Sequence, residues 1–143
     1  ADLIVSNAVL QWASDLPLFL ARLSESLAPR GTLACATFTA GTAREMAEAG
    51  GVSLAYPTAP QLEDACEPYV RLEHHETATY TQSFDSPADI LRQFSRTGSN
   101  AVTDRPWTRG DVSLFADRYH SLYGADVHLT YHALFFLARR EDA

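Results

Sequence analysis

The sequence predicts an α/β fold, and two observations carry this prediction. A short apolar run at residues 3–5, closed by Ser6 and Asn7, is typical of a strand buried on both faces, and a second run follows at residues 32–38. Between them lies a segment with apolar residues at helical spacing. A strand, a helix and a second strand form a βαβ unit, whose crossover makes the two strands parallel. We therefore expect residues 3–5 to form a central parallel strand.

The helix of this unit is predicted from its start signal and its apolar stripe. Ser14 and Asp15 precede Pro17, a combination typical of a helix N-terminus. The stripe consists of leucines at helical spacing, namely Leu16, Leu20, Leu23 and Leu27. The helix is expected to end at residues 28–31, which contain Pro and Gly.

Two short helices are predicted next. Thr42 is a candidate cap for a helix that runs to Ala49 and stops at the two glycines that follow it. Thr58, two residues before a proline, begins another helix that carries Leu62 and Cys66 inward.

Four further elements complete the expected order. Residues 70–84 alternate in the manner of a half-exposed strand, and their charge suits the edge of a sheet. A helix begins at residues 86–87 and closes at Gly98, and a second helix covers residues 108–124. Residues 127–138 form a long last strand, which we expect to run antiparallel to the strand at residues 70–84.

Composition and charge exclude several classes of protein. The 143 residues, 46% of them hydrophobic, fit one domain with a real core. All eleven basic residues are Arg and the net charge is −7, so a nucleic-acid partner is not expected. The charge is uneven, because residues 86–124 contain five Arg and four Asp and are the only part of the chain with net positive charge.

Cysteine usage and hydropathy indicate a cytoplasmic protein. Cys35 and Cys66 stand alone, without the spacing of a zinc site or a disulfide framework, and are expected to be core residues. No apolar run is long enough to span a membrane, and the chain begins with neither a signal sequence nor Met.

Tests for familiar chemistry leave few candidate residues. His74 and His75 are adjacent on a predicted strand and point to opposite faces, so they do not chelate one metal ion. Neither a nucleophile elbow nor a phosphate-binding glycine loop is present. Tyr131 and His132 lie within an apolar strand, where polar side chains need partners, structural or functional. Asn7 follows a strand at the edge where α/β sheets bind ligands, although it also fits an ordinary turn.

Several stretches resemble class I S-adenosylmethionine-dependent methyltransferases. Residues 2–12 look like the fourth strand of that fold, and residues 28–38, with their Pro-Gly turn, look like the fifth. More narrowly, the Ser-Asn-x-x-x-Gln-Trp string of residues 6–12, the helix end at residues 94–98 and the Leu-Thr-Tyr-His-Ala-Leu-Phe string of residues 129–135 are similar to the biotin-pathway malonyl-[acyl-carrier protein] O-methyltransferases.

The resemblance implies the C-terminal half of a Rossmann-like class I methyltransferase. Residues 1–85 would form the core βαβ unit and a further strand, residues 86–124 a helical lid inserted before the last strand, and residues 125–143 that strand and a tail. The chain begins at the family's fourth strand, so the glycine-rich loop and the acidic residue that bind the cofactor are absent. Between Met46 and Pro60 it also looks shorter than relatives and has no Arg.

The resemblance also implies roles for particular residues. Asn7 and Ala8 would border the methionine part of S-adenosylmethionine, with Gln11 and Trp12 at the entrance of the site. In the lid, Arg96 is the candidate partner of the substrate carboxylate or phosphopantetheine. Tyr131 and His132 would face the acyl site or pack beneath the lid. The resemblance thus implies that the cofactor is bound by Asn7, Ala8, Gln11 and Trp12, and the substrate by Arg96, Tyr131 and His132.

The implied activity is methylation of the free carboxylate of a malonyl thioester, carried on acyl-carrier protein or CoA. A carboxylate is already ionised at pH 7, so no catalytic base and no metal is expected. Two alternatives stay open: a non-catalytic half-domain or subunit completed by a partner chain, and a methyltransferase for another small acid or a hydroxyl. The chain alone is expected to be inactive and to bind the cofactor poorly.

Overall fold

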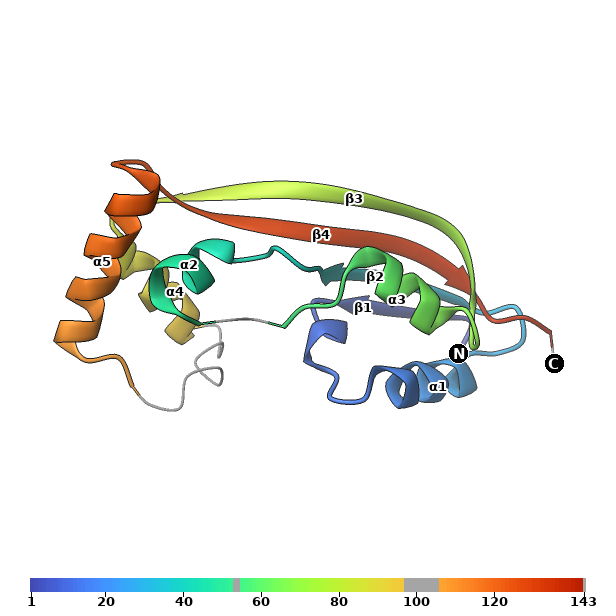
Figure 1. The fold of residues 1–143 in the computed structure, drawn as a ribbon. Helices are drawn as coiled ribbons and strands as arrows, with labels where there is room; N and C mark the ends of the chain where they lie inside the picture. The colour runs from blue at the N-terminus through green and yellow to red at the C-terminus, as the bar shows by residue number, and fades with distance from the viewer. Residues whose placement is uncertain (53–54, 97–105, 143) are drawn as a thin grey trace. The chain divides into compact units, whose positions relative to one another are not determined.

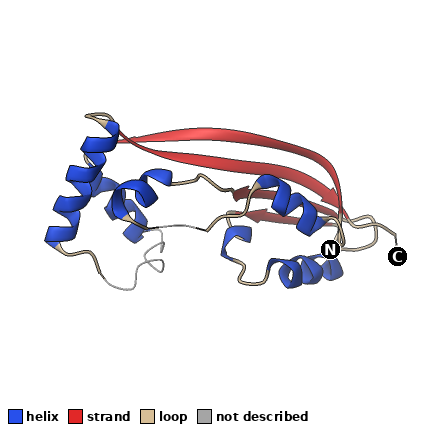
Figure 2. Ribbon diagram, viewed as in Figure 1, coloured by secondary structure: helices blue, strands red, loops and turns tan. Residues whose placement is uncertain are grey.

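A computed structural model describes residues 1–52, 55–96 and 106–142. Its elements follow the predicted alternation of strands and helices (Figure 1). In chain order they are β1 (Leu3–Asn7), the short 3-10 helix η1 (Leu10–Trp12), α1 (Leu16–Ser26), β2 (Thr32–Phe38), α2 (Arg44–Gly50), α3 (Ala59–Cys66), β3 (Arg71–Phe84), α4 (Pro87–Arg96), α5 (Arg109–Tyr123) and β4 (Val127–Arg139). Figure 2 shows the same elements by type.

The four strands form one mixed sheet in the order β1-β2-β4-β3. β1 and β2 are parallel, with Val5 opposite Ala34, and β2 and β4 are antiparallel, with Ala34 opposite Leu137. β3 lies next to β4, and the two arrows point in opposite directions in Figure 1. The predicted βαβ unit and the antiparallel last strand are confirmed.

The chain divides into two compact units. The first contains Ala1–Ala40, Tyr56–Thr79 and His132–Ala143, and the second contains Gly41–Ala55 and Tyr80–Tyr131. The second unit therefore holds the predicted two-helix segment and also α2 and the adjoining ends of β3 and β4. The physical reason is packing, because Met46 and Ala49 of α2 lie in the same apolar cluster as Phe115 of α5.

The core of the first unit lies between its sheet and two helices. Leu20 of α1 and Leu62 of α3 are almost fully buried in one cluster with Leu33 of β2 and Leu134 of β4. Cys35 and Cys66 belong to the same cluster as free thiols, so their prediction as core residues is confirmed.

Helix starts follow the predicted capping residues, with one difference. The Asp15 side chain caps α1, and Thr58 and Thr108 each form a complete capping box at α3 and α5. In α2, by contrast, the residue at the cap is Ala43, which makes no side-chain cap bond and has a left-handed backbone with φ 56°. Gly51, also left-handed, ends α2 as expected, whereas the predicted closure by Gly98 lies outside the described residues.

The expectation that the first strand is central and buried on both faces is wrong. β1 is an edge strand in the described sheet, and Leu3 and Val5 are 57% and 70% exposed. Val5, Ala34 and Leu137, opposite one another on three strands, line a hollow of about 440 Å³ on the face away from α1 and α3. An apolar run indicates only that a strand is suited to burial. Among the described residues, no helix or strand covers this face of the sheet.

Candidate functional site

The carboxyl ends of β1 and β2 lie at the same edge of the sheet. Asn7, the last residue of β1, is opposite Ala36 and has an exposed side chain. Ala8 follows with a left-handed backbone (φ 54°) and donates its N–H to the Ala36 carbonyl at 2.8 Å. A non-glycine residue in this region is uncommon and marks a constrained turn. The turn points the chain away from the sheet immediately after the polar residue.

Gln11 and Trp12 lie in η1, just beyond this turn. The buried hydroxyl of Thr37 donates to Gln11 Oε1 at 2.8 Å, which leaves the amide hydrogens of Gln11 as donors. Trp12 is 51% exposed and, with Val9, Leu18 and Arg22, lines a hollow of about 340 Å³. All four predicted cofactor residues therefore lie on one short segment at the carboxyl end of β1.

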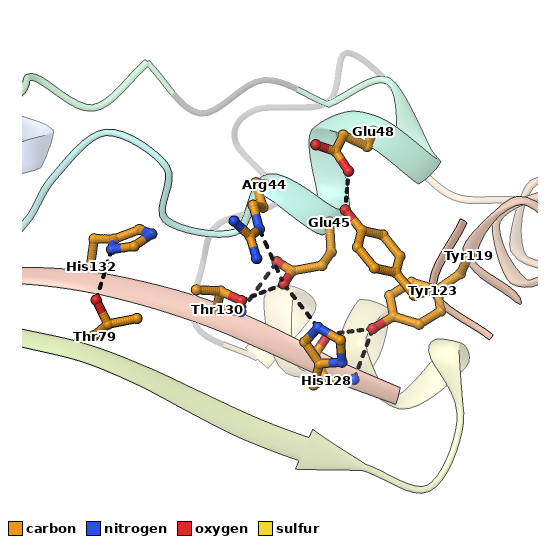
Figure 3. A network of polar contacts seen from close by, with 9 residues as sticks. All are labelled: Arg44, Glu45, Glu48, Thr79, Tyr119, Tyr123, His128, Thr130 and His132. Atoms are coloured by element: carbon orange, nitrogen blue, oxygen red, sulfur yellow. Dashed lines mark hydrogen bonds and ion pairs between the residues drawn. The ribbon is translucent and has the colours of Figure 1, made fainter. Parts of the chain in front are cut away.

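His132 lies in the first unit and is held by β3. Its Nδ1 is 3.1 Å from Thr79 Oγ1, and its carbonyl accepts the Thr39 N–H at 2.9 Å (Figure 3). The contacts with Thr79 and Thr39 account for His132 as a polar residue within an apolar strand. This is the structural one of the two explanations that the sequence left open.

Tyr131 lies in the second unit, in a cluster with Gln82 of β3 and Gln93 of α4. Its hydroxyl accepts from Gln93 Nε2 at 3.1 Å and donates to Gln82 Oε1 at 3.3 Å. Partial burial raises the pKa of the Tyr131 phenol, and the Glu45 carboxylate raises it further, against the Gln93 hydrogen bond, which lowers it. The phenol therefore remains protonated at neutral pH.

Arg96 is the last residue of α4 and is exposed. It lies in the second unit with Tyr131, whereas the predicted cofactor residues and His132 lie in the first. On the same helix, Arg92 forms an ion pair with Asp89. Arg96 is therefore exposed to solvent, where its guanidinium can contact either a binding partner or only water.

A buried carboxylate in the second unit was not predicted from the sequence. Glu45 of α2 is fully buried and accepts from the Thr130 N–H at 3.1 Å and from the Thr130 hydroxyl at 2.5 Å, with His128 Nε2 3.5 Å away (Figure 3). The Ala43 N–H also donates to the Thr130 carbonyl at 2.7 Å. These contacts fasten the start of α2 to β4.

Nucleophilic and metal chemistry find no support among the described residues. Burial raises the pKa of the Cys35 thiol to about 12 and that of Cys66 to about 11, so both are inert at neutral pH. Within residues 1–52, 55–96 and 106–142, no group of His, Cys, Asp or Glu is arranged to hold a metal ion. The same residues include no helix long and apolar enough to cross a membrane.

Comparison with solved structures identifies the class of fold. A putative methyltransferase from Bacillus halodurans superposes with a TM-score of 0.62, at 11% identity, over 98% of this chain and 64% of that protein. The YcgJ protein of Bacillus subtilis gives a TM-score of 0.60 at 8% identity, over 99% of this chain and 64% of that protein. The fold is that of class I methyltransferases.

Sequence comparison is more specific. Malonyl-[acyl-carrier protein] O-methyltransferases from Chlorobium luteolum and Haemophilus influenzae are 38% and 34% identical, over 99% and 96% of this chain and 54% of each relative. No family model matches the chain. The chain is thus similar along its whole length to malonyl-[acyl-carrier protein] O-methyltransferases, and the resemblance seen in the sequence motifs is confirmed. It spans about half the length of the curated relatives it matches, consistent with a C-terminal portion.

Proposed function

We propose that this chain is part of an S-adenosylmethionine-dependent O-methyltransferase that esterifies the free carboxylate of a malonyl thioester for biotin synthesis. One observation carries the proposal: 38% identity over nearly the whole chain to a malonyl-[acyl-carrier protein] O-methyltransferase. The class I methyltransferase fold supports it. The full-length protein would accept the malonyl group on acyl-carrier protein or CoA.

The residues at the end of β1 fit one part of the cofactor. Asn7 and the amide hydrogens of Gln11 offer polar groups for an amino acid moiety, and Trp12 offers an apolar wall. The Ala8 N–H already donates to Ala36, so Ala8 would border the cofactor without binding it through that group. The chain spans about half the length of the relatives it matches, so we expect firm cofactor binding only in a longer protein.

Bound S-adenosylmethionine would supply an electrophilic methyl group. The substrate carboxylate is ionised at pH 7, so residues of this chain need not remove a proton. Their work would be to bind and orient the carboxylate for in-line attack and to exclude water. Tyr131, His132 and Arg96 are the proposed substrate-binding residues.

Product analysis tests the proposal. The full-length protein, meaning this chain joined to the remainder of such a methyltransferase, should convert malonyl-[acyl-carrier protein] to its methyl ester, detected by mass spectrometry. Acetyl-[acyl-carrier protein], which has no free carboxylate, is the control and should not react. Methylation of a different acid or of a hydroxyl, with the malonyl substrate untouched, would overturn the choice of substrate.

Arg96→Ala tests the lid. Loss of a hydrogen bond to a charged group costs about 1.5–3 kcal/mol, so the specificity constant for the malonyl carrier substrate should fall roughly ten- to over a hundredfold. Affinity for the cofactor should remain nearly unchanged. Arg118→Ala, on α5, is a matched exposed control. Equal activity of wild type and Arg96→Ala would remove Arg96 from the proposed site.

One observation also favours the alternative of a subunit completed by a second chain. The outer edge of β1 has no pairing strand among the described residues, and Leu3 and Val5 are exposed beside it. Such an edge suits pairing with another chain. Copurification of an intact polypeptide of this length with a second protein, and activity of the pair alone, would support that arrangement.

A further inference from the structure

Thr37 is a buried hydroxyl residue on the face of β2 that otherwise packs into the core. Leu33, Cys35 and Thr37 are successive buried positions along this strand. Leu33 and Cys35 belong to the apolar cluster of the first unit, and Thr37, 3% exposed, is the polar member of the row. A hydroxyl removed from water needs a hydrogen-bond partner, because burying it without one is costly. Thr37 is therefore expected to fix the group to which it bonds.

The partner of the Thr37 hydroxyl is the side-chain amide of Gln11. Thr37 Oγ1 lies 2.8 Å from Gln11 Oε1, and the bond connects β2 to η1. A hydroxyl both donates and accepts, so it can bond either end of an amide. In both cases the bond holds the Gln11 side chain at the carboxyl end of β2.

The backbone that carries Gln11 is fixed independently of this bond. The Ala8 N–H donates to the Ala36 carbonyl at 2.8 Å, which ties the turn after β1 to β2. Leu10, 2% exposed, anchors η1 in the core of the first unit. Loss of the Thr37 hydroxyl should therefore release the Gln11 side chain without displacing η1.

A side chain that is already ordered binds a ligand more tightly than a mobile one. Ordering one long side chain on binding weakens the affinity by roughly two- to tenfold. Gln11 is half-buried and lies on the same segment of the first unit as Asn7 and Trp12. An amide held there can bond the amino acid part of a ligand without this loss.

We propose that Thr37 is a positioning residue that holds the Gln11 amide ready for the amino acid part of S-adenosylmethionine. This inference rests on the proposed function, because the cofactor role of Gln11 is part of that function. Thr37 is buried on the core face of β2, so its effect on the cofactor passes through Gln11. Both residues belong to the first unit.

Thr37→Val tests the inference, because valine keeps the branched shape and removes the hydroxyl. In the full-length protein, calorimetric titration should show the dissociation constant for S-adenosylmethionine rising about three- to tenfold. At saturating cofactor, kcat should change much less. Thr37→Ser keeps the hydroxyl and should retain wild-type affinity. Thr32→Val, the same change at the other end of β2, is the matched control and should also bind the cofactor normally.

A double-mutant comparison separates positioning from a general loosening of β2. Gln11→Ala should weaken cofactor binding at least as much as Thr37→Val. Adding Thr37→Val to Gln11→Ala should change the dissociation constant less than about 1.5-fold further, because both residues act through one side chain. Effects that multiply would overturn the inference, as would wild-type affinity of Gln11→Ala or a Thr37→Ser variant as weak as Thr37→Val. Thr37→Ala replaces Thr37→Val if the valine variant does not fold.

A second measurement needs neither cofactor nor methyl transfer. In the full-length protein, the side-chain amide signal of Gln11 can be identified by its loss in Gln11→Ala. NMR relaxation should show this amide restrained in the wild type and mobile in Thr37→Val, and equal mobility in both would contradict the inference. A wild-type enzyme that binds the cofactor but leaves malonyl thioesters unmethylated would overturn the choice of substrate alone. A wild-type protein that does not bind the cofactor would overturn both proposals.

Discussion

At the scale of single residues, Glu45 is a fully buried side chain whose carboxylate has several polar partners. A fully buried carboxylate is costly unless its oxygens are satisfied, and here Thr130 supplies both an N–H and a hydroxyl. His128 lies 3.5 Å from Oε1, and Arg44 lies 3.9 Å from it with an exposed side chain. The carboxylate thus adds polar contacts between a short helix and a strand to the apolar packing of their neighbouring residues.

Glu45→Ala should therefore destabilise the chain by about 3 kcal/mol, because it leaves the buried Thr130 donors without an acceptor. Glu45→Gln keeps one acceptor oxygen and should cost less. Urea unfolding followed by circular dichroism measures both variants. Glu25→Ala, at an exposed position of α1, is the control, and equal stability of Glu45→Ala and Glu25→Ala would mean that the carboxylate does not hold α2.

The two buried thiols predict a dependence of stability on alkaline pH. Burial raises the pKa of Cys35 from 9.0 to about 12 and that of Cys66 from 9.0 to about 11. Between these values the unfolded chain has lost protons that the folded chain still binds, so the free energy of unfolding should fall as pH rises above 9. Denaturant titrations at pH 8 and 10 check this, with Cys35→Ala expected to flatten the change.

Residue-scale contacts were the hardest to predict. Glu45 follows an Arg in a short helix, and this pattern is typical of an exposed face. The polar cluster combines residues from three elements, Gln82, Gln93 and Tyr131, so no spacing within one element predicts it. By contrast, Asn7 was singled out because the carboxyl end of a parallel strand is a place where α/β sheets bind ligands, and its role stays a prediction.

At the scale of elements, the starts of α1, α3 and α5 are encoded locally by their capping residues. Thr108 and Asp111 close the start of α5, with the Asp111 N–H donating to Thr108 Oγ1 at 3.1 Å and the Thr108 N–H donating to Asp111 Oδ2 at 2.8 Å. Thr108→Ala removes one of these partners and should cost about 1 kcal/mol of stability. Thermal unfolding measures it, and Ser121→Ala, exposed on the same helix, should cost nothing.

Elements whose signals are local were predicted nearly to the residue, as α1, β2 and α3 illustrate. β1 was predicted as a strand but not as an edge strand, because the sequence of five residues does not indicate which strands pair with it. The start of α2 was displaced from Thr42 to Ala43 because the Ala43 N–H bonds to the Thr130 carbonyl across the unit, a contact from outside the helix.

At the scale of the whole molecule, cofactor binding should distinguish the chain from a full-length enzyme. Asn7 and Gln11 offer only a few polar groups at one edge of the sheet, so calorimetric titration of the isolated chain with S-adenosylmethionine should give no micromolar affinity. The full-length protein, titrated in parallel, should bind. A micromolar dissociation constant for the isolated chain would contradict this and show that these residues suffice.

The open edge of β1 also makes this chain a ready half of a split reporter. Val5, Ala34 and Leu137 present an apolar row on three strands beside an edge that can take one more strand. Under the proposed function, fusing this chain and the complementary half of a relative to two proteins of interest would make methyl ester formation depend on their meeting. A lysine at position 5 would lower spontaneous reassembly, since edge charges oppose unassisted pairing, and so would set the background of such an assay.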